Sequence, residues 1–243
     1  MKTIALIPIK FNNRRLPGKN IKPLGGRPLM QHIQETLLQV KGIDEIYVYC
    51  SDEGVKEYLL PGVCYLKRPQ SLDQDSTKIN EVLASFAQAK KADLYLLTHA
   101  TAPFIKAESI QKGIDAVKSD NYDSAFAVIR QQDFLWQNGK PLNYDLSAIP
   151  RTQDLVPIYR ETCGFYFYSY AQIVDRNRRI GENPCLIEVD EEESVDIDEA
   201  DDFAMAEYVL NMKVRNNVGY KLTYHKCKNR IHAAKSICNE VAA

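Results

Sequence analysis

A basic, turn-rich segment near the N-terminus carries side chains suited to binding phosphate groups. It follows the apolar run 3–9, and its cations are Lys10, Arg14, Arg15 and Lys19. A loop that leaves the carboxyl end of a parallel strand points its backbone N–H groups outward, and cationic side chains there neutralise phosphate charge. The segment has neither of the glycine-rich patterns GxGxxG and GxxxxGK[ST]. Taken alone, it predicts a triphosphate pocket and an ordinary solvated turn equally well.

Two carboxylates far along the chain are spaced to bind a divalent cation. In Asp196-Ile197-Asp198, the alternation of an extended segment places both acids on one face and turns Ile197 toward the core. Mg²⁺ usually takes one or two protein carboxylates together with phosphate oxygens and water. The alternative is that Asp198 or Glu199 caps the following helix while Asp196 is a solvated strand end. The acidic run 188–193 is interpreted as a solvated face.

Apolar runs of strand length alternate with helical patterns along the chain. The predicted strands cover residues 3–9, 45–50, 93–98, 124–129 and 164–168. The predicted helices cover residues 28–40, 76–90 and 199–212. Continuous apolar strands separated by amphipathic helices are typical of βαβ units, so an α/β fold with a parallel sheet is expected.

Two of the predicted helices carry more specific expectations. The helix over 76–90 has Asp75 or Ser76 as its N-cap. In the last helix, the residues expected to face inward are Ala200, Phe203 and Ala204.

Four polar segments follow predicted strands or lie beside them. They cover residues 51–53, 68–76, 99–104 and 194–199. In an open parallel sheet, ligands bind outside the carboxyl ends of the strands. The shared location of these segments therefore predicts that they meet at one ligand site with the basic loop.

Composition narrows the class of protein. The chain has 243 residues, of which 45% are hydrophobic and 26% charged, with a formal net charge of −1. This predicts a globular protein rather than a disordered chain or a coiled coil. The apolar run ending at Pro8 is too short for a signal peptide and no apolar stretch reaches 18 residues, so a cytoplasmic location without a membrane partner is expected. Its charge pattern indicates no nucleic-acid partner.

The six cysteines show no CxxC spacing, so they give no support to zinc binding or thioredoxin-like chemistry and are expected to be reduced.

Helix and strand periodicity is lost between residues 131 and 146. Trp136, Asn138-Gly139 and Pro141 give turn signals there, so a hairpin or lobe projecting from the sheet is expected. Phe134, Leu135 and Trp136 form an apolar patch of the kind that contacts a partner. Residues 213–243 are basic and poorly periodic, and are interpreted as a tail after a domain spanning 1–212.

Eight ordered blocks resemble the acylneuraminate cytidylyltransferases, also called CMP-sialic acid synthetases. They are Pro8, 16–24, 51–52, 68–69, 101–103, 153–155, 159–161 with Gly164, and 194–198. The match spans about residues 3 to 207. The resemblance implies a Rossmann-like nucleotidyltransferase fold of three layers, with a projecting dimerisation lobe at about 130–160. It also implies a homodimer that couples CTP to an acidic sugar and releases pyrophosphate.

The resemblance assigns roles to individual residues. The residues expected in catalysis are Lys10, Arg14, Lys19 and Asp198. Those expected to bind the nucleotide are Lys10, Asn13, Arg14, Lys19, Asn20, Arg68 and Ser76. Those expected to bind the acceptor are His99, Thr101, Arg151, Arg160 and Glu161. Asp196 and Asp198 match the metal-binding pair, with Mg²⁺ as the cofactor.

Three departures from the family pattern concern the loop and the acceptor. The usual Gly-Gly-Ser-Lys is Phe-Asn-Asn-Arg at residues 11–14, the usual Gln-Pro-Thr-Ser-Pro is His-Ala-Thr-Ala-Pro at 99–103, and Thr152 interrupts a run of arginines. CMP-Kdo synthetases share the form of the loop at 15–19. The acceptor is therefore open between sialic acid, Kdo, another nonulosonic acid and a phosphonate. A non-catalytic nucleotide-binding protein on the same scaffold is the second alternative, and the identity of the base is also open.

Overall fold

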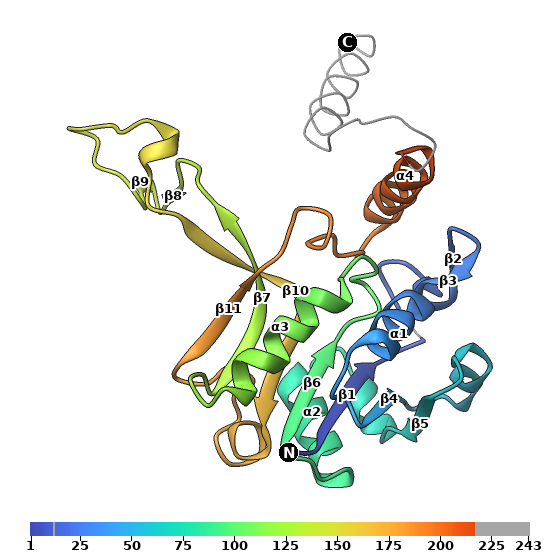
Figure 1. Ribbon diagram of the computed structural model, residues 1–243. Helices are drawn as coiled ribbons and strands as arrows, with labels where there is room; N and C mark the ends of the chain where they lie inside the picture. The colour runs from blue at the N-terminus through green and yellow to red at the C-terminus, as the bar shows by residue number, and fades with distance from the viewer. Residues whose placement is uncertain (12, 217–243) are drawn as a thin grey trace.

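A large, mostly parallel β-sheet forms the centre of the protein. The computed structural model describes residues 1–11 and 13–216. Within them, the strand order of this sheet is β11-β7-β10-β6-β1-β4-β5 (Figure 1). The parallel strands are β1 (Thr3–Pro8), β4 (Glu45–Cys50), β5 (Val63–Lys67), β6 (Leu94–Thr98), β7 (Ser124–Gln131) and β11 (Pro184–Glu188). Strand β10 (Ile158–Ser169) runs antiparallel between β6 and β7. The expected α/β class is confirmed.

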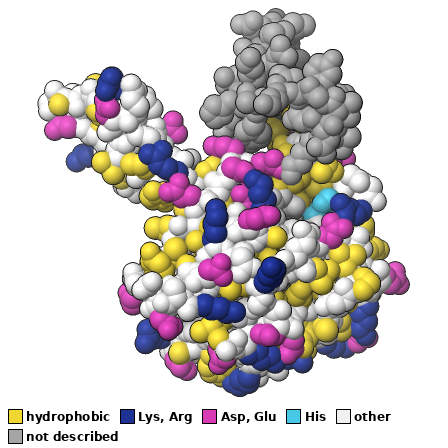
Figure 2. Space-filling view, viewed as in Figure 1, with side chains coloured by type: hydrophobic (Ala, Val, Ile, Leu, Met, Phe, Trp, Pro, Cys, Tyr) yellow, Lys and Arg dark blue, Asp and Glu magenta, His cyan; other side chains and the backbone are white. Residues whose placement is uncertain are grey.

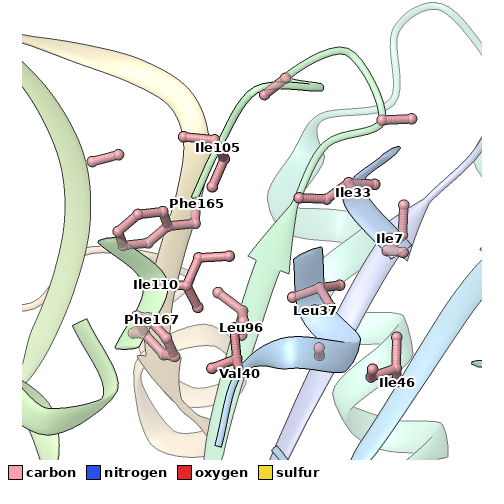
Figure 3. Close-up of a cluster of buried hydrophobic side chains, with 14 of the residues drawn as sticks. Ile7, Ile33, Leu37, Val40, Ile46, Leu96, Ile105, Ile110, Phe165 and Phe167 are labelled. Carbon is pink, nitrogen blue, oxygen red and sulfur yellow. The ribbon is translucent and has the colours of Figure 1, made fainter. Parts of the chain in front are cut away.

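Helices cover both faces of the sheet and give three layers. Helices α1 (Leu29–Gln39) and α3 (Ala107–Lys118) lie on one face, and α2 (Ile79–Ala89) lies on the other with the short helix η5 (Ala171–Asp175) (Figure 1). Figure 3 shows the core between the sheet and the helices α1 and α3, where Leu37 of α1 lies near Leu96 of β6 and Ile33 of α1 lies near Ile7 of β1. The side chains in this core are excluded from water, which is the main force that holds the layers together.

For several elements, the bounds predicted from the sequence agree closely with those in the structure. The helix expected over 28–40 is α1, and the strand expected over 45–50 is β4. The patterns that produce α3, β5 and β11 were not assigned from the sequence.

The start of α2 corrects one prediction. The helix begins at Ile79, three residues after the expected Ser76. Neither Asp75 nor Ser76 caps it; instead the Glu81 side chain accepts a hydrogen bond from the Lys78 backbone N–H at 3.1 Å. Asp75 is engaged elsewhere, by two cations of the basic loop.

Helix α4 (Ala200–Asn216) corrects another prediction. It buries Phe203, as expected, but Ala200 and Ala204 are exposed. The buried face continues through Ala206 and Val209, because a spacing of three residues keeps side chains on one face of a helix. Helix α4 also extends beyond residue 212, into the segment interpreted as a tail, and residues 217–243 of that predicted tail lie outside the described residues.

A lobe extends from the sheet between β7 and β10 (Figure 1). It contains the hairpin β8 (Trp136–Gln137) and β9 (Lys140–Pro141), and a 3-10 turn, η4 (Thr152–Asp154). The hairpin turn has positive φ at Asn138 (51°) and Gly139 (74°), as a type I′ turn requires. The predicted hairpin is therefore present, although its Leu135 is only partly exposed.

Large apolar side chains lie on the surface of this lobe. Figure 2 shows hydrophobic side chains gathered on it. The lobe patch is defined by Phe134, Trp136, Leu142, Leu146, Ile149, Val156 and Tyr159. Large exposed apolar side chains of this kind are suited to contact with a partner.

None of the helices in the described part of the chain is long and apolar enough to cross a membrane.

Candidate nucleotide and acceptor site

Loops after several parallel strands enclose a cleft at one edge of the sheet. The cleft has a volume of about 970 Å³. Its lining comes from the basic loop and from two of the four predicted polar segments, 51–53 and 68–76, whereas the segments 99–104 and 194–199 do not line it. It is formed by Lys10, Phe11, Arg14, Ser51, Asp52, Glu53, Lys67, Arg68, Pro69, Gln70, Asp73, Gln74 and Asp75. The segments are brought together because β1, β4 and β5 are parallel neighbours, so their carboxyl ends meet at the same edge.

Two cations of the basic loop are held by one carboxylate across the cleft. Lys10 Nζ lies 3.1 Å from Asp75 Oδ1, and Arg14 forms an ion pair with the other oxygen of Asp75. These side chains are partly or largely exposed, so the pairs are weak in water and can exchange for a phosphate ligand. Asn20, which is buried, donates from Nδ2 to the Lys10 backbone oxygen at 2.9 Å and to Asn13 Oδ1 at 3.3 Å. The loop is thereby anchored from below.

A glycine in the left-handed region aims Lys19 inward. Gly18 has φ of +67° and precedes the short helix η1 (Lys19–Ile21), a backbone conformation that favours glycine. Lys19 is only 7% exposed, and its Nζ donates to the Ile197 backbone oxygen at 2.6 Å and to Asp198 Oδ1 at 3.1 Å. Arg15 Nη2 lies 2.7 Å from the same Asp198 oxygen. The basic loop therefore meets the acidic pair directly.

The acidic pair has the alternation that its spacing predicts. Ile197 is fully buried, and its backbone N–H donates to the Thr101 oxygen at 2.8 Å. The carboxylate of Asp198 does not cap α4: Asp202 Oδ2 accepts from the N–H groups of Asp198 and Glu199 at 3.0 and 2.8 Å. The helix-cap alternative for Asp198 is thus wrong.

The donor set fits a hard cation that shares its coordination with phosphate. Asp196 Oδ1 is buried and has no hydrogen-bond partner among the described residues, which is costly unless a ligand satisfies it. Residues 1–11 and 13–216 contain no cluster of three or more His, Cys, Asp or Glu side chains able to hold a metal. Mg²⁺ needs only one or two protein carboxylates when phosphate oxygens and water complete its shell.

Arg68 is buried at the opposite end of the cleft. It is 4% exposed, and Nη2 lies 2.5 Å from Asp73 Oδ1, whose other oxygen accepts a hydrogen bond from the Ser51 hydroxyl. The Nε–H of Arg68 has no partner in the described part of the chain. A buried guanidinium with a free donor is suited to hydrogen-bond a ligand acceptor.

His99 and Cys163 lie in the electrostatic environment of Asp196. Burial lowers the pKa of His99 to about 4, although the Asp196 carboxylate opposes this change. Burial also raises the pKa of the Cys163 thiol to about 12, and the charge of Asp196 adds to the effect. At neutral pH, His99 is therefore a neutral imidazole and Cys163 a neutral thiol.

The remaining predicted site residues are more scattered. Arg151 is on the lobe, exposed and paired with Asp154 at 2.7 Å, and Arg160 is exposed on β10. Glu161, next to it, accepts a hydrogen bond from the Tyr166 hydroxyl at 3.0 Å. Ser76 is exposed and is not among the residues that line the cleft.

Sequence reasoning missed the partners that hold the cationic side chains. Asp73 and Asp75 belong to a segment that was expected at the ligand site, but neither was given a role there. The sequence did contain a signal for these partners, because the segment 68–76 carries acidic residues and was expected to lie at the same site as the basic loop.

The sheet and this cleft define the class of protein: an α/β nucleotidyltransferase fold, with a cleft lined by four cations and four carboxylates. A known structure with the same fold is CMP:2-keto-3-deoxy-manno-octonic acid synthetase complexed with CTP, with a TM-score of 0.67 and 18% identity over 88% of this chain and 100% of that one. A 4-diphosphocytidyl-2C-methyl-D-erythritol synthase from Anaerococcus prevotii follows at 0.59, with 16% identity over 86% and 96% of the chains.

The chain belongs to the cytidylyltransferase family, whose model matches residues 4–215. It is 26% identical to N-acylneuraminate cytidylyltransferase A of Danio rerio over 84% of this chain and 49% of that protein. It is also 26% identical to the 3-deoxy-manno-octulosonate cytidylyltransferase of Thermodesulfovibrio yellowstonii, over 75% and 78% respectively. The chain spans about half the length of the Danio protein. The suspected family is confirmed, including its likeness to the Kdo enzymes.

Proposed function

We propose that this protein transfers CMP from CTP to an acidic sugar and releases pyrophosphate. The observation that carries the proposal is the contact between Lys19 of the basic loop and Asp198 of the acidic pair, at 3.1 Å. It joins a phosphate-binding element to a cation-binding element, which is the combination that a metal-bound triphosphate needs. The family of the chain supports cytosine as the base.

The reaction requires little covalent chemistry from the protein. An acceptor hydroxyl attacks the α-phosphorus of CTP, the new O–P bond forms as the bond to the bridging oxygen breaks, and the hydroxyl proton is lost to water. Positioning and charge stabilisation dominate such transfers. Lys10, Arg14 and Lys19 stabilise the charge that grows on pyrophosphate, with Asn13 and Asn20 shaping the loop around it.

Arg68 contacts the base end of the nucleotide. Its buried guanidinium is oriented by Asp73, which leaves the Nε–H free for an acceptor atom of the base. Ser76 adjoins this end of the cleft from the segment before α2.

Asp196 and Asp198 hold Mg²⁺ in this proposal. The unpartnered oxygen of Asp196 supports that role. A bound magnesium ion would offset the negative charge on the triphosphate.

An acidic sugar is the acceptor class that the relatives support, since those of Danio rerio and Thermodesulfovibrio yellowstonii are named for N-acylneuraminate and 3-deoxy-manno-octulosonate. His99 and Thr101 lie at the end of β6 beside the acidic pair, where neutral His99 can accept a hydrogen bond from a sugar hydroxyl. Glu161, Arg160 and Arg151 belong to the acceptor side. Consumption of CTP fits a cytoplasmic location.

We also propose that the protein is a homodimer through the lobe patch. This patch includes five side chains more than half exposed: Trp136, Leu142, Leu146, Ile149 and Val156. A second copy would remove this apolar surface from water and stabilise the lobe. Arg151 and Arg160, on or near this lobe, then lie close to the dimer interface.

A pyrophosphate-release assay tests the proposed activity. The protein is incubated with Mg²⁺, with each of CTP, UTP, ATP and GTP, and with N-acetylneuraminate, Kdo or a phosphonate. We expect release with CTP and at least one acid, and no release without Mg²⁺. Binding of CTP without pyrophosphate release with every acid would instead indicate a non-catalytic nucleotide-binding protein.

A further inference from the structure

A second hollow lies beside the nucleotide cleft, between the start of α2 and the loop after η5. It has a volume of about 480 Å³. Its lining residues are Lys78, Ile79, Asn80, Glu81, Asn177 and Arg179. The nucleotide cleft ends at Asp75 and this hollow begins at Lys78, so both border the same short segment of chain. Two cations, Lys78 and Arg179, line it from different elements.

Neighbouring side chains fix the guanidinium of Arg179. Its Cζ lies 4.2 Å from the centre of the Tyr166 ring, and Nη2 is 3.4 Å from the Tyr166 hydroxyl. Tyr166 is 2% exposed and donates to Glu161 and to the Thr162 backbone oxygen, so the platform under the guanidinium is rigid. A preorganised guanidinium loses little conformational entropy when it binds a ligand.

Arg179 retains unused hydrogen-bonding capacity. The oxygen of Glu161 closest to it is 3.6 Å from Nη2, which is longer than a direct hydrogen bond, and Glu161 is about half exposed. Within the described residues, Nε and Nη1 of Arg179 have no hydrogen-bond partner. Arginine presents its donors as a planar fork that matches a carboxylate. A carboxylate ligand would therefore satisfy donors that the protein leaves open.

The hollow lies close to the end of β6, which leads into His99. Tyr166, whose ring lies under the guanidinium of Arg179, is paired in the sheet with Leu97 of β6, two residues before His99. The Tyr166 hydroxyl also donates to the backbone oxygen of Thr162, the residue before Cys163. These contacts connect the hollow with the proposed reaction centre.

Arg179 is a candidate for the cationic role that the interrupted arginine run leaves open. Thr152 interrupts a run of arginines in the family pattern, and Arg151 is paired with Asp154 on the exposed lobe. We propose that this hollow is the acceptor subsite and that Arg179 recognises the carboxylate of the acidic acceptor. The proposal rests on the CMP transfer proposed above.

The test compares each acid with its own methyl ester. N-acetylneuraminate and Kdo are assayed as free acid and as ester with saturating CTP and Mg²⁺, and the discrimination is the ratio of kcat/KM for acid over ester. In Arg179→Gln we expect this ratio to fall about 10-fold or more, from loss of one or two charge-assisted hydrogen bonds, through a raised acceptor KM. The KM for CTP stays within about twofold, and Arg179→Lys restores part of the ratio.

Arg176→Ala is the matched control. Arg176 is three residues away, exposed, and makes no ion pair with any residue in the described ranges. Its variant keeps the full discrimination. If Arg179 serves only to hold Tyr166 and Glu161, its loss lowers acid and ester turnover alike, and an unchanged ratio in Arg179→Gln overturns the proposal.

A second measurement uses the unmodified protein, so it does not depend on the folding of a variant. Phenylglyoxal labelling of arginines is followed by peptide mass spectrometry, with CMP and Mg²⁺ present. The free acid is expected to protect Arg179 about fivefold or more, while the ester gives no protection and Arg176 labels equally in all samples. Equal labelling of Arg179 with acid and ester overturns the proposal. If the protein transfers CMP to no acid at all, the proposed function fails and this inference fails with it.

Discussion

Lys19 Nζ lies 3.1 Å from Asp198 Oδ1, although 179 residues separate the two along the chain. Lys19 is buried at this contact and also donates to the Ile197 backbone oxygen, so the amine is fixed at the base of the acidic pair. In the proposed reaction, Asp198 would help to hold Mg²⁺, which would offset charge on the triphosphate. The ion pairs of Asp198 with Lys19 and Arg15 hold these three side chains together.

Asp198→Asn is expected to lower kcat for pyrophosphate release by about 100-fold or more, because the variant loses charge that holds Mg²⁺ beside the triphosphate. The protein still unfolds cooperatively, since Lys19 keeps its bond to Ile197. Steady-state assays and thermal unfolding measure both effects. Glu199→Gln removes an exposed charge one residue away and serves as the control, with activity within about twofold. Full activity in Asp198→Asn would contradict the metal assignment.

Arg68→Lys is expected to raise the KM for CTP about 10-fold, because lysine replaces a planar guanidinium whose Nε–H is unpartnered with a single ammonium group. The acceptor KM does not change. Arg27→Lys, the same replacement at an exposed position paired with Glu35, controls for the chemistry of the substitution. An increase confined to the acceptor KM would show that Arg68 contacts the acceptor and not the nucleotide.

Asp75→Asn is expected to tighten inhibition by pyrophosphate about threefold or more at low salt, because it releases Lys10 and Arg14 from a competing carboxylate. The effect shrinks as the ionic strength rises, since these side chains are exposed. Product-inhibition constants at several salt concentrations measure it, with Asp115→Asn on α3 as the control. Weaker inhibition would mean that Asp75 positions the loop for phosphate rather than competing with it.

The lobe patch is expected to hold two copies of the chain together. The double variant Ile149→Asp with Val156→Asp places charge in an apolar interface and is expected to convert the dimer to a species with the 27.7 kDa mass of one chain. Sedimentation velocity measures the mass. Leu38→Asp changes an exposed apolar residue of α1 and leaves the dimer intact. A wild-type protein that sediments as a monomer at micromolar concentration would contradict the interface.

Regular hydrophobic patterns made the sheet predictable. The apolar runs of β1, β4 and β6 are continuous because both faces of the sheet are covered, and such runs are recognisable in a sequence. The predicted start of α2 was wrong. Asp75 and Ser76 have side chains that commonly cap helices, but Asp75 contacts Lys10 and Arg14 instead. The helix-capping propensity of a local segment gives no information about an ion pair that forms between residues 65 positions apart.

The residues of the candidate site differ in how clearly the sequence marks them. Lys19 and Asp198 belong to contiguous motifs, and the burial of Ile197 is the alternation that the spacing of the acidic pair predicts. Arg179 lies in an irregular loop among other arginines, and only the packing of its guanidinium on Tyr166 distinguishes it from them. Such a contact between a loop and a strand depends on tertiary structure.

Formation of the CMP-linked product tests the central proposal most directly. The protein is incubated with CTP, Mg²⁺ and each of N-acetylneuraminate and Kdo, and the products are followed by ³¹P NMR and mass spectrometry. We expect equal amounts of pyrophosphate and of a phosphodiester that links CMP to one acid, both absent in Asp198→Asn. Hydrolysis of CTP without a CMP-linked sugar, or no reaction with any acidic sugar, would contradict the proposed transfer.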